Sequence, residues 1–512
     1  MHQKAARLLG RFALIAIASL LTLLAVRVWE VSRAPPLLPW HKQVPEELAA
    51  GAIDQLDWQG WTAHESALFD AVDASIPADL PARYAVPSNR YSTTSPMHRS
   101  RRTEDWNRSF VLEPDGPARG AVVLLHGLTD APYSMRHIAR HYRVRGFVAV
   151  GVRLPGHGTV PGGLTGSGRA DWRAATRLAV REARRRVPDG PLHIVGYSTG
   201  AALALSHALD AVDEPDLGRP DHIVLVSPMV GVSALARFAG VLGWPAVFPA
   251  FARAAWVDIR PEFNPYKYNS FPVRAARESS LLSRDVQTEL AARVENASIT
   301  QLPPILAFQS TIDATVSTPA VIDALFGLLP GNGSELVLFD FDRRAGLGPL
   351  LRAGNATPES LLRPPPREYA VCVHSNAGRE DQQVVETCTP AGTTKDIVRE
   401  AGRRFPAEVY SLSHVALPFP VHDGLYGLEP DPADIPGVNL GAISARGERG
   451  MLVVPAADFA RLTSNPFFDA ILDRLDQLLV PPAETAPADA QSDPESSSNA
   501  ITSASSRPLA AG

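Results

Sequence analysis

The chain has 512 residues, 45% of them hydrophobic, which is enough to fill the core of one large globular domain with insertions. Its formal net charge of −5 and its pI near 6.3 provide no long-range attraction to nucleic acid. Because no basic patch with interleaved aromatic residues stands out either, we expect no nucleic-acid partner.

The N-terminal segment is basic up to Arg11 and apolar from Phe12 to Val26. As a helix this run spans about 22 Å, short of the roughly 30 Å core of a bilayer, and extending it past Arg27 nearly closes the gap. Residues 1–33 are therefore interpreted as a signal anchor or a cleaved signal peptide. We favour the anchor, because no small-x-small cleavage site directly follows the run. In both cases we expect the main body to be exported, either membrane-anchored on the non-cytoplasmic side or secreted.

The segments that flank the main domain differ from it in composition. Residues 34–107 are rich in Pro, Ala and polar residues, with Trp58, Trp61 and Phe69 as anchors, and predict a linker followed by an N-terminal packing segment. Residues 481–512 are rich in Ala, Ser and Pro and poor in aromatic residues, which predicts a disordered tail.

Between these segments, strand and helix patterns alternate. Strands are expected at 108–113, 121–125, 147–153, 192–195, 222–227, 305–309, 335–341 and 408–412. Helices are expected at 134–145, 171–186, 201–209, 319–328 and 466–479. The alternation predicts an α/β domain over 108–480, with a mostly parallel sheet flanked by helices and ligands bound at the carboxyl ends of the strands.

One motif within this pattern indicates chemistry. Residues 196–200 read Gly-Tyr-Ser-Thr-Gly, which matches Gly-x-Ser-x-Gly between a predicted strand and a predicted helix. The two glycines permit a tight turn, so the hydroxyl of Ser198 should stand exposed at the carboxyl edge of the sheet. A serine held in this way is a candidate nucleophile.

Two further stretches of sequence strengthen the interpretation of Ser198 as a nucleophile. Residues 126–130 read His-Gly-Leu-Thr-Asp after the second strand, and residues 153–159 read Arg-Leu-Pro-Gly-His-Gly-Thr after the third. Together with the serine motif they resemble the α/β-hydrolase superfamily, in its monoacylglycerol lipase and carboxylesterase-like branch. The resemblance implies an α/β-hydrolase fold and a serine hydrolase that needs no metal or organic cofactor.

Acyl transfer requires a base for the serine and an acid that orients the base, and this fold has them in the order Ser, Asp, His. Asp313 follows the strand at 305–309, in the turn where the family's acid sits. Other aspartates fit this place less well: Asp285, Asp323, Asp340 and Asp342.

His414 follows the strand expected at 408–412 and is the preferred base; His422 and His374 are the alternatives. By resemblance, the backbone N–H groups of Leu128 and Thr199 form the oxyanion hole. The same resemblance gives His126 and His157 the role of shaping their loops.

Two insertions depart from the minimal pattern. Residues 231–302 lie where the family places its cap, and their aromatic first half would suit a lid over an acyl chain or simple packing onto the core. Residues 342–405 separate acid and base and could form a flap or a docking surface. This second insertion holds Cys372 and Cys388, for which a disulfide or two unpaired thiols are possible, whereas their spacing does not indicate a metal site.

The sequence thus predicts a serine hydrolase that cleaves a small-molecule or lipid-like carboxylic ester, with membrane contact through its N-terminal segment. A thioesterase, an acyltransferase or an amide or peptide hydrolase would use the same machinery. A hydrolase fold that has lost catalysis and serves as a binding module is the alternative from another class.

Overall fold

The computed structural model describes residues 2–33, 35–102, 104–231, 249–343, 357–378, 381–406, 410–443 and 454–479. The tail expected to be disordered therefore lies outside the described residues. So do residues 232–248, which make up most of the aromatic first half of the expected cap.

A ten-stranded sheet forms the middle layer, in the order β1-β3-β2-β4-β5-β8-β9-β10-β11-β12. Its strands are β1 (Phe110–Leu112), β2 (Gly120–Leu125), β3 (Phe147–Val152), β4 (Leu192–Tyr197), β5 (His222–Val226), β8 (Ile305–Ser310), β9 (Glu335–Phe339), β10 (Ala370–Ser375), β11 (Gln383–Thr389) and β12 (Ile397–Arg404). Pairing is parallel from β3 to β10, and antiparallel for β1 at one edge and for β11 and β12 at the other. This mostly parallel sheet confirms the predicted fold class.

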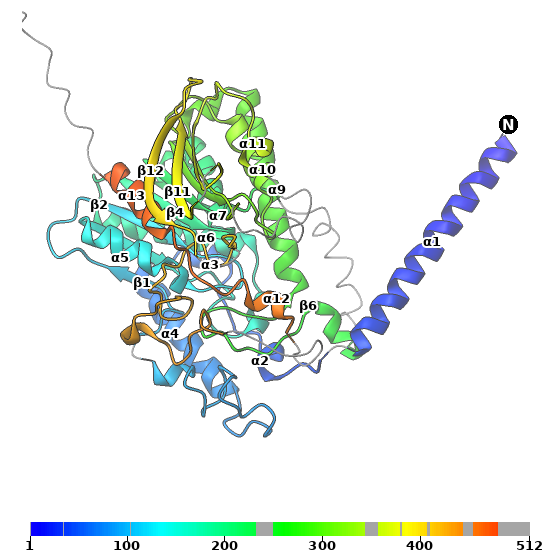
Figure 1. Ribbon diagram of the computed structural model, residues 1–512. Coiled ribbons are helices and arrows are strands. Elements are labelled where there is room, and N and C mark those ends of the chain that lie inside the picture. The colour runs from blue at the N-terminus through cyan, green and yellow to red at the C-terminus, as the bar shows by residue number, and fades with distance from the viewer. Residues whose placement is uncertain are drawn as a thin grey trace, which may run out of the picture.

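Helices cover both faces of the sheet (Figure 1). Side chains alternate along each strand, so that in β2 Val123 packs with one hydrophobic cluster and Val122 with the other. The first cluster takes in helices α6 (Arg169–Arg186), α7 (Thr199–Asp213), α9 (Val273–Glu295) and α10 (Thr318–Ala324). The second takes in helices α5 (Arg136–Val144) and α13 (Phe468–Leu479). Burial on both faces explains why the central strands are continuous apolar runs.

Shorter elements connect these layers. They are η1 (Arg99–Arg101), η2 (Pro132–Met135), η3 (Pro161–Thr165), η4 (Pro215–Leu217), η7 (Pro249–Ala255), β6 (Trp256–Asp258), β7 (Phe271–Pro272), η8 (Ser298–Gln301), η9 (Phe326–Leu328), α11 (Pro358–Leu361), η11 (Pro432–Asp434) and α12 (Ala456–Phe459). In the expected cap, Trp256 is buried against the ring of His41, with ring centroids 5.0 Å apart, so this side chain packs the segment onto the body.

The segment expected to begin as a linker is folded against the α/β domain. It forms α2 (Pro39–Lys42), α3 (Ala50–Asp54) and α4 (Trp58–Ser75). Ile53 and Trp61 are fully buried in the first hydrophobic cluster, and Phe69 is also buried. These helices therefore belong to the core packing of the domain.

The N-terminal helix α1 (His2–Arg33) projects away from the rest of the molecule (Figure 1). Arg11 and Arg27 bound its apolar run. Across the described residues, no helix combines the length and the apolar character needed to span a membrane. The membrane anchor expected from the sequence, and membrane contact through it, are therefore not supported.

The insertion between acid and base extends the sheet. Its strand β10 pairs with β9, and β11 and β12 follow as an antiparallel hairpin. The insertion returns to its starting point, because the N–H of Asp342 donates to the carbonyl of Tyr410 at 2.9 Å. The strand expected at 408–412 is wrong in its described part, 410–412. β8 and β10 already occupy both sides of β9, so this segment cannot pair with β9.

Candidate active site

Ser198 lies at the turn between β4 and α7, in the strained conformation φ 55°, ψ −112°. The flanking glycines allow this turn, because a Cβ on Gly196 would lie 2.4 Å from the carbonyl oxygen of Gly200, and one on Gly200 would lie 2.1 Å from that of Leu125. The N–H of Ser198 donates to the carbonyl of Val226 at 2.9 Å, which ties the turn to β5. The serine hydroxyl is thereby presented at the carboxyl edge of the sheet.

The structure brings the predicted nucleophile, base and acid together. Ser198 Oγ lies 3.1 Å from His414 Nε2, and His414 Nδ1 lies 2.9 Å from Asp313 Oδ2. The three residues come from different parts of the chain: Ser198 follows β4, Asp313 follows β8, and His414 follows the return of the insertion. This geometry suits proton transfer from the serine to the imidazole.

Asp313 is held in one orientation by its own turn. Its Oδ1 accepts the N–H groups of Thr315 and Val316 at 2.7 and 2.9 Å, which leaves Oδ2 to face His414. Burial alone would raise the pKa of Asp313, but the charge of His414 and hydrogen bonds from His414, Ser227 and Val316 lower it overall. An ionised Asp313 stabilises the tautomer in which Nδ1 of His414 carries the proton and Nε2 faces the serine.

Ser227 is a site residue that the sequence analysis missed. Its hydroxyl donates to Asp313 Oδ2 and lies 2.8 Å from His414 Nδ1. Ser227 directly follows β5 and has a positive φ of 49°. Its position at the carboxyl end of a central strand was the available signal, because such ends converge on one edge of a parallel sheet.

The two residues proposed for the oxyanion hole line the same cavity as Ser198 and His414. Thr199 is the first residue of α7, where N–H groups have no partner within the helix. Leu128 belongs to a loop held by His126, whose ring nitrogens contact the carbonyl of Gly127 at 2.9 Å and the N–H of Leu154 at 3.0 Å. Burial lowers the pKa of His126 to about 3, so this side chain is a neutral support of the loop.

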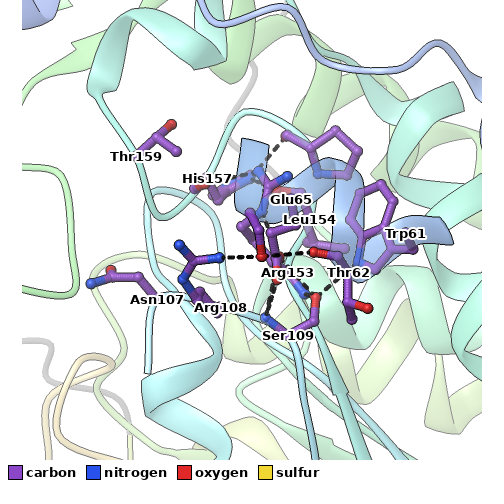
Figure 2. A network of polar contacts seen from close by, with 12 residues as sticks. Trp61, Thr62, Glu65, Asn107, Arg108, Ser109, Arg153, Leu154, His157 and Thr159 are labelled. Carbon is purple, nitrogen blue, oxygen red and sulfur yellow. Dashed lines mark hydrogen bonds and ion pairs between the residues drawn. The ribbon is translucent and has the colours of Figure 1, made fainter. Parts of the chain in front are cut away.

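A buried ionic network lies behind this loop (Figure 2). Arg153, fully buried after β3, donates to Glu65 of α4 at 2.8 Å, to Glu47 at 2.6 Å and to the carbonyl of His157 at 3.1 Å. Glu65 in turn accepts the N–H of Ser109 at 3.1 Å. The network joins the N-terminal helices to the loop at 153–159, whose Leu154 contacts His126.

The cavity above Ser198 has a volume of about 460 Å³. Apolar side chains make up part of its wall: Met229, Phe263, Phe271, Val316, Val415 and Leu462. Charged side chains also line it: Arg260, Lys267, Asp458 and Arg461. The cavity therefore offers both an apolar surface for a hydrocarbon group and a charged surface near the nucleophile.

The alternative bases and acids lie elsewhere. His422 faces the ring of His137 at 5.5 Å, and His374 of β10 pairs with Glu386 at 3.3 Å. The remaining aspartates have their own partners: Asp285 with Arg169, Asp323 with Arg363, Asp340 with Arg343 and Asp342 with Asn376. None of these six residues lines the cavity above Ser198.

Cys372 and Cys388 are opposite each other on β10 and β11, and their sulfur atoms are joined in a disulfide. These cysteines and Glu386 form one of two groups of potential metal ligands in the described part of the chain. In that group the sulfurs are bonded to each other. The other group consists of His137, Asp423 and Asp434, and both of its carboxylates bind the guanidinium of Arg136. The first group therefore fits a disulfide, and the second fits an ion pair, better than a metal centre.

Comparisons with known proteins find matches over part of the chain. A family model described as serine aminopeptidase, S33, matches residues 116–320. A thermostable monoacylglycerol lipase from Bacillus sp. (strain H-257) is 26% identical over 44% of this chain and 81% of its own length. Lipase LipV from Mycobacterium tuberculosis (strain ATCC 25618 / H37Rv) is 26% identical over 52% of this chain and 95% of its own. A soluble variant of the monoglyceride lipase from Saccharomyces cerevisiae is 13% identical, with a TM-score of 0.37, over 45% of this chain and 82% of that structure.

Proposed function

Because this chain is an α/β-hydrolase of the lipase and esterase type, we propose that it hydrolyses carboxylic esters through an acyl-enzyme formed on Ser198. The observation that carries the proposal is the hydrogen-bonded series from Ser198 through His414 to Asp313 at the wall of a cavity. A hydroxyl, an imidazole and a carboxylate in this order form the group that activates a serine for acyl transfer.

In the first half of the reaction, Ser198 Oγ attacks the ester carbonyl carbon while its proton moves to His414 Nε2. The carbonyl oxygen becomes an oxyanion, which the N–H groups of Leu128 and Thr199 stabilise by about 3 kcal/mol for each donor. The intermediate collapses, the bond to the alcohol oxygen breaks, and His414 returns the proton to that oxygen. Asp313 stabilises the imidazolium while it exists.

In the second half, His414 takes a proton from water, the hydroxide oxygen attacks the acyl carbon, and the bond to Ser198 Oγ breaks as His414 protonates it. The apolar part of the cavity supports an ester with a hydrocarbon group. The same residues could act on thioesters or on amides, and the family description names an aminopeptidase, so the test includes these substrates.

The test measures hydrolysis of 4-nitrophenyl esters from acetate to palmitate by the wild-type protein and by Ser198→Ala. We expect the variant to lose at least about 1,000-fold in kcat/KM, because it lacks the hydroxyl that forms the acyl-enzyme in the proposed reaction. A fluorophosphonate probe should label the wild type alone.

Ser206→Ala is the matched control, since Ser206 is a fully buried serine of α7 that does not line the cavity. Activity of Ser198→Ala equal to that of the wild type would contradict the mechanism. Activity of the wild type on thioesters or peptides alone would change the substrate class.

A further inference from the structure

Two cationic side chains line the cavity together with Ser198 and His414. Lys267, in the segment between β6 and β7, lies with its Nζ 3.5 Å from the carbonyl oxygen of Leu128, in the loop of the oxyanion hole. Arg461, shortly after α12, donates from Nη2 to the hydroxyl of Thr315 at 2.6 Å, beside the acid turn. The partners of both cations are neutral oxygen atoms.

The third cation of the cavity, Arg260, is already balanced by two carboxylates, Asp258 and Asp458. Among the residues that the structure describes, Lys267 and Arg461 form no ion pair. The charge of Asp130 raises the pKa of Lys267, although the two side chains form no ion pair. The cavity wall therefore carries two cations without an ion-pair partner among the described residues, and the more distant carboxylate of Asp130 balances Lys267 only in part.

The positive charges of Lys267 and Arg461 also repel each other. Burial is the main cause that lowers the pKa of Lys267; the charge of Asp130 raises it, and the charge of Arg461 lowers it further. Holding two like charges in a partly dry cavity is unfavourable, and an anion between them would relieve both the repulsion and the loss of hydration.

We propose that the substrate of this site is an ester that also carries an anionic group, a carboxylate or a phosphate, bound by Lys267 and Arg461. This inference rests on the proposed function, because it concerns the same cavity and nucleophile. Arg461 supplies a planar fork of donors that suits a carboxylate or phosphate, and Lys267 supplies a point charge. The same charges disfavour a substrate with a free ammonium group, such as the N-terminus of a peptide.

The test compares three esters of equal acyl chain: 4-nitrophenyl hexanoate, the mono-4-nitrophenyl ester of hexanedioic acid, and 4-nitrophenyl 6-(phosphonooxy)hexanoate. The readout is the ratio of kcat/KM for each anionic ester to kcat/KM for the neutral one. We expect a ratio above one in the wild type and a fall of about 10-fold to 100-fold in Lys267→Met and in Arg461→Met. Added salt should lower the ratio in the wild type more than in the variants.

Lys395→Met and Arg219→Met are the controls, because both side chains are exposed and outside the cavity, and they should leave the ratio unchanged. The larger of the two wild-type ratios identifies the preferred anion. A ratio that the cavity variants do not change, or an equal loss on all three esters, would overturn the anion site while leaving the esterase proposal intact.

A binding measurement separates the two proposals. Calorimetric titration of hexanedioate into Ser198→Ala should show binding that is lost when Lys267→Met is added to that variant. Binding of this kind in a protein that hydrolyses no ester would refute the proposed function alone, and its absence from a working esterase would refute the anion site alone.

Discussion

At the level of single residues, the geometry of the site depends on which hydrogen-bond partners each polar atom has. Asp313 accepts two backbone N–H groups on one oxygen and faces His414 and Ser227 with the other. Ser227 therefore does not touch the reacting atoms but acts through Asp313 and His414. We regard it as a positioning residue, whose hydroxyl helps to keep the carboxylate ionised and the imidazole in place.

Removing the hydroxyl of Ser227 tests this positioning role. In Ser227→Ala we expect kcat for ester hydrolysis to fall by about 10-fold with KM nearly unchanged, because a hydrogen bond to a charged group is lost while the cavity keeps its shape. Steady-state kinetics on 4-nitrophenyl butyrate would measure this.

The control for Ser227→Ala is again Ser206→Ala, in which a buried hydroxyl without a hydrogen-bond partner among the described residues is removed. If both variants behave alike, or if Ser227→Ala raises KM and leaves kcat intact, Ser227 does not position the acid and the base.

At the level of elements, the N-terminal helices support the loop at 153–159, whose Leu154 contacts His126 beside the predicted oxyanion hole. Arg153 binds Glu65 of α4 (Figure 2). It also binds Glu47 ahead of α3, and the backbone N–H of Gly156 donates to Glu47 at 2.7 Å. Buried charges of this kind are costly unless they remain paired. The helices that the sequence suggested as a linker and packing segment therefore maintain the geometry of the loop at 153–159.

Breaking this network should destabilise the whole domain. We expect Glu65→Ala to lower the free energy of unfolding by about 3 kcal/mol, since it leaves the buried guanidinium of Arg153 with a single carboxylate partner. Chemical denaturation would measure the change. Glu104→Ala is the control, because the pair of Glu104 with Arg140 is exposed, and a similar loss in this variant would contradict the argument.

At the scale of the whole molecule, several histidines are buried in the neutral form. Burial lowers the pKa of His41 and His207 to about 4 and that of His126 and His193 to about 3. In the unfolded chain these groups take up a proton near pH 6.5, whereas in the folded protein they do not. Their contribution to stability is therefore complete above about pH 6.5 and is lost as the pH falls towards 4 and 3.

We accordingly expect the melting temperature to be nearly constant from about pH 8 to about pH 6.5 and to fall as the pH is lowered further to about 4. Over that lower range each histidine costs up to about 1.4 kcal/mol of folding free energy per pH unit. Differential scanning fluorimetry would follow the change. His207→Gln should weaken the dependence, and His422→Gln, at an exposed position, should not. A melting temperature that is constant or rises on acidification would contradict this account.

Some features of this protein follow from its sequence alone. The apolar strand runs and the helices between them predict the parallel sheet, because each strand must be buried on both faces. Gly196, Ser198 and Gly200 predict the sharp turn, since only glycine fits where backbone approaches so closely. Asp313 and His414 could be selected by chain order and by their place after strands or strand-like segments, and the structure brings both to Ser198, although their catalytic roles stay predictions.

Other features were decided only by tertiary structure. The strands within residues 370–404 extend the sheet beyond β9, so that residues 410–412 cannot pair with β9. Ser227, Lys267 and Arg461 reach the site from segments with no catalytic motif, and no spacing in the sequence relates them to Ser198. The physical reason is that local patterns report hydrophobic periodicity and backbone geometry, whereas the partners of a polar side chain depend on contacts between residues far apart in the chain.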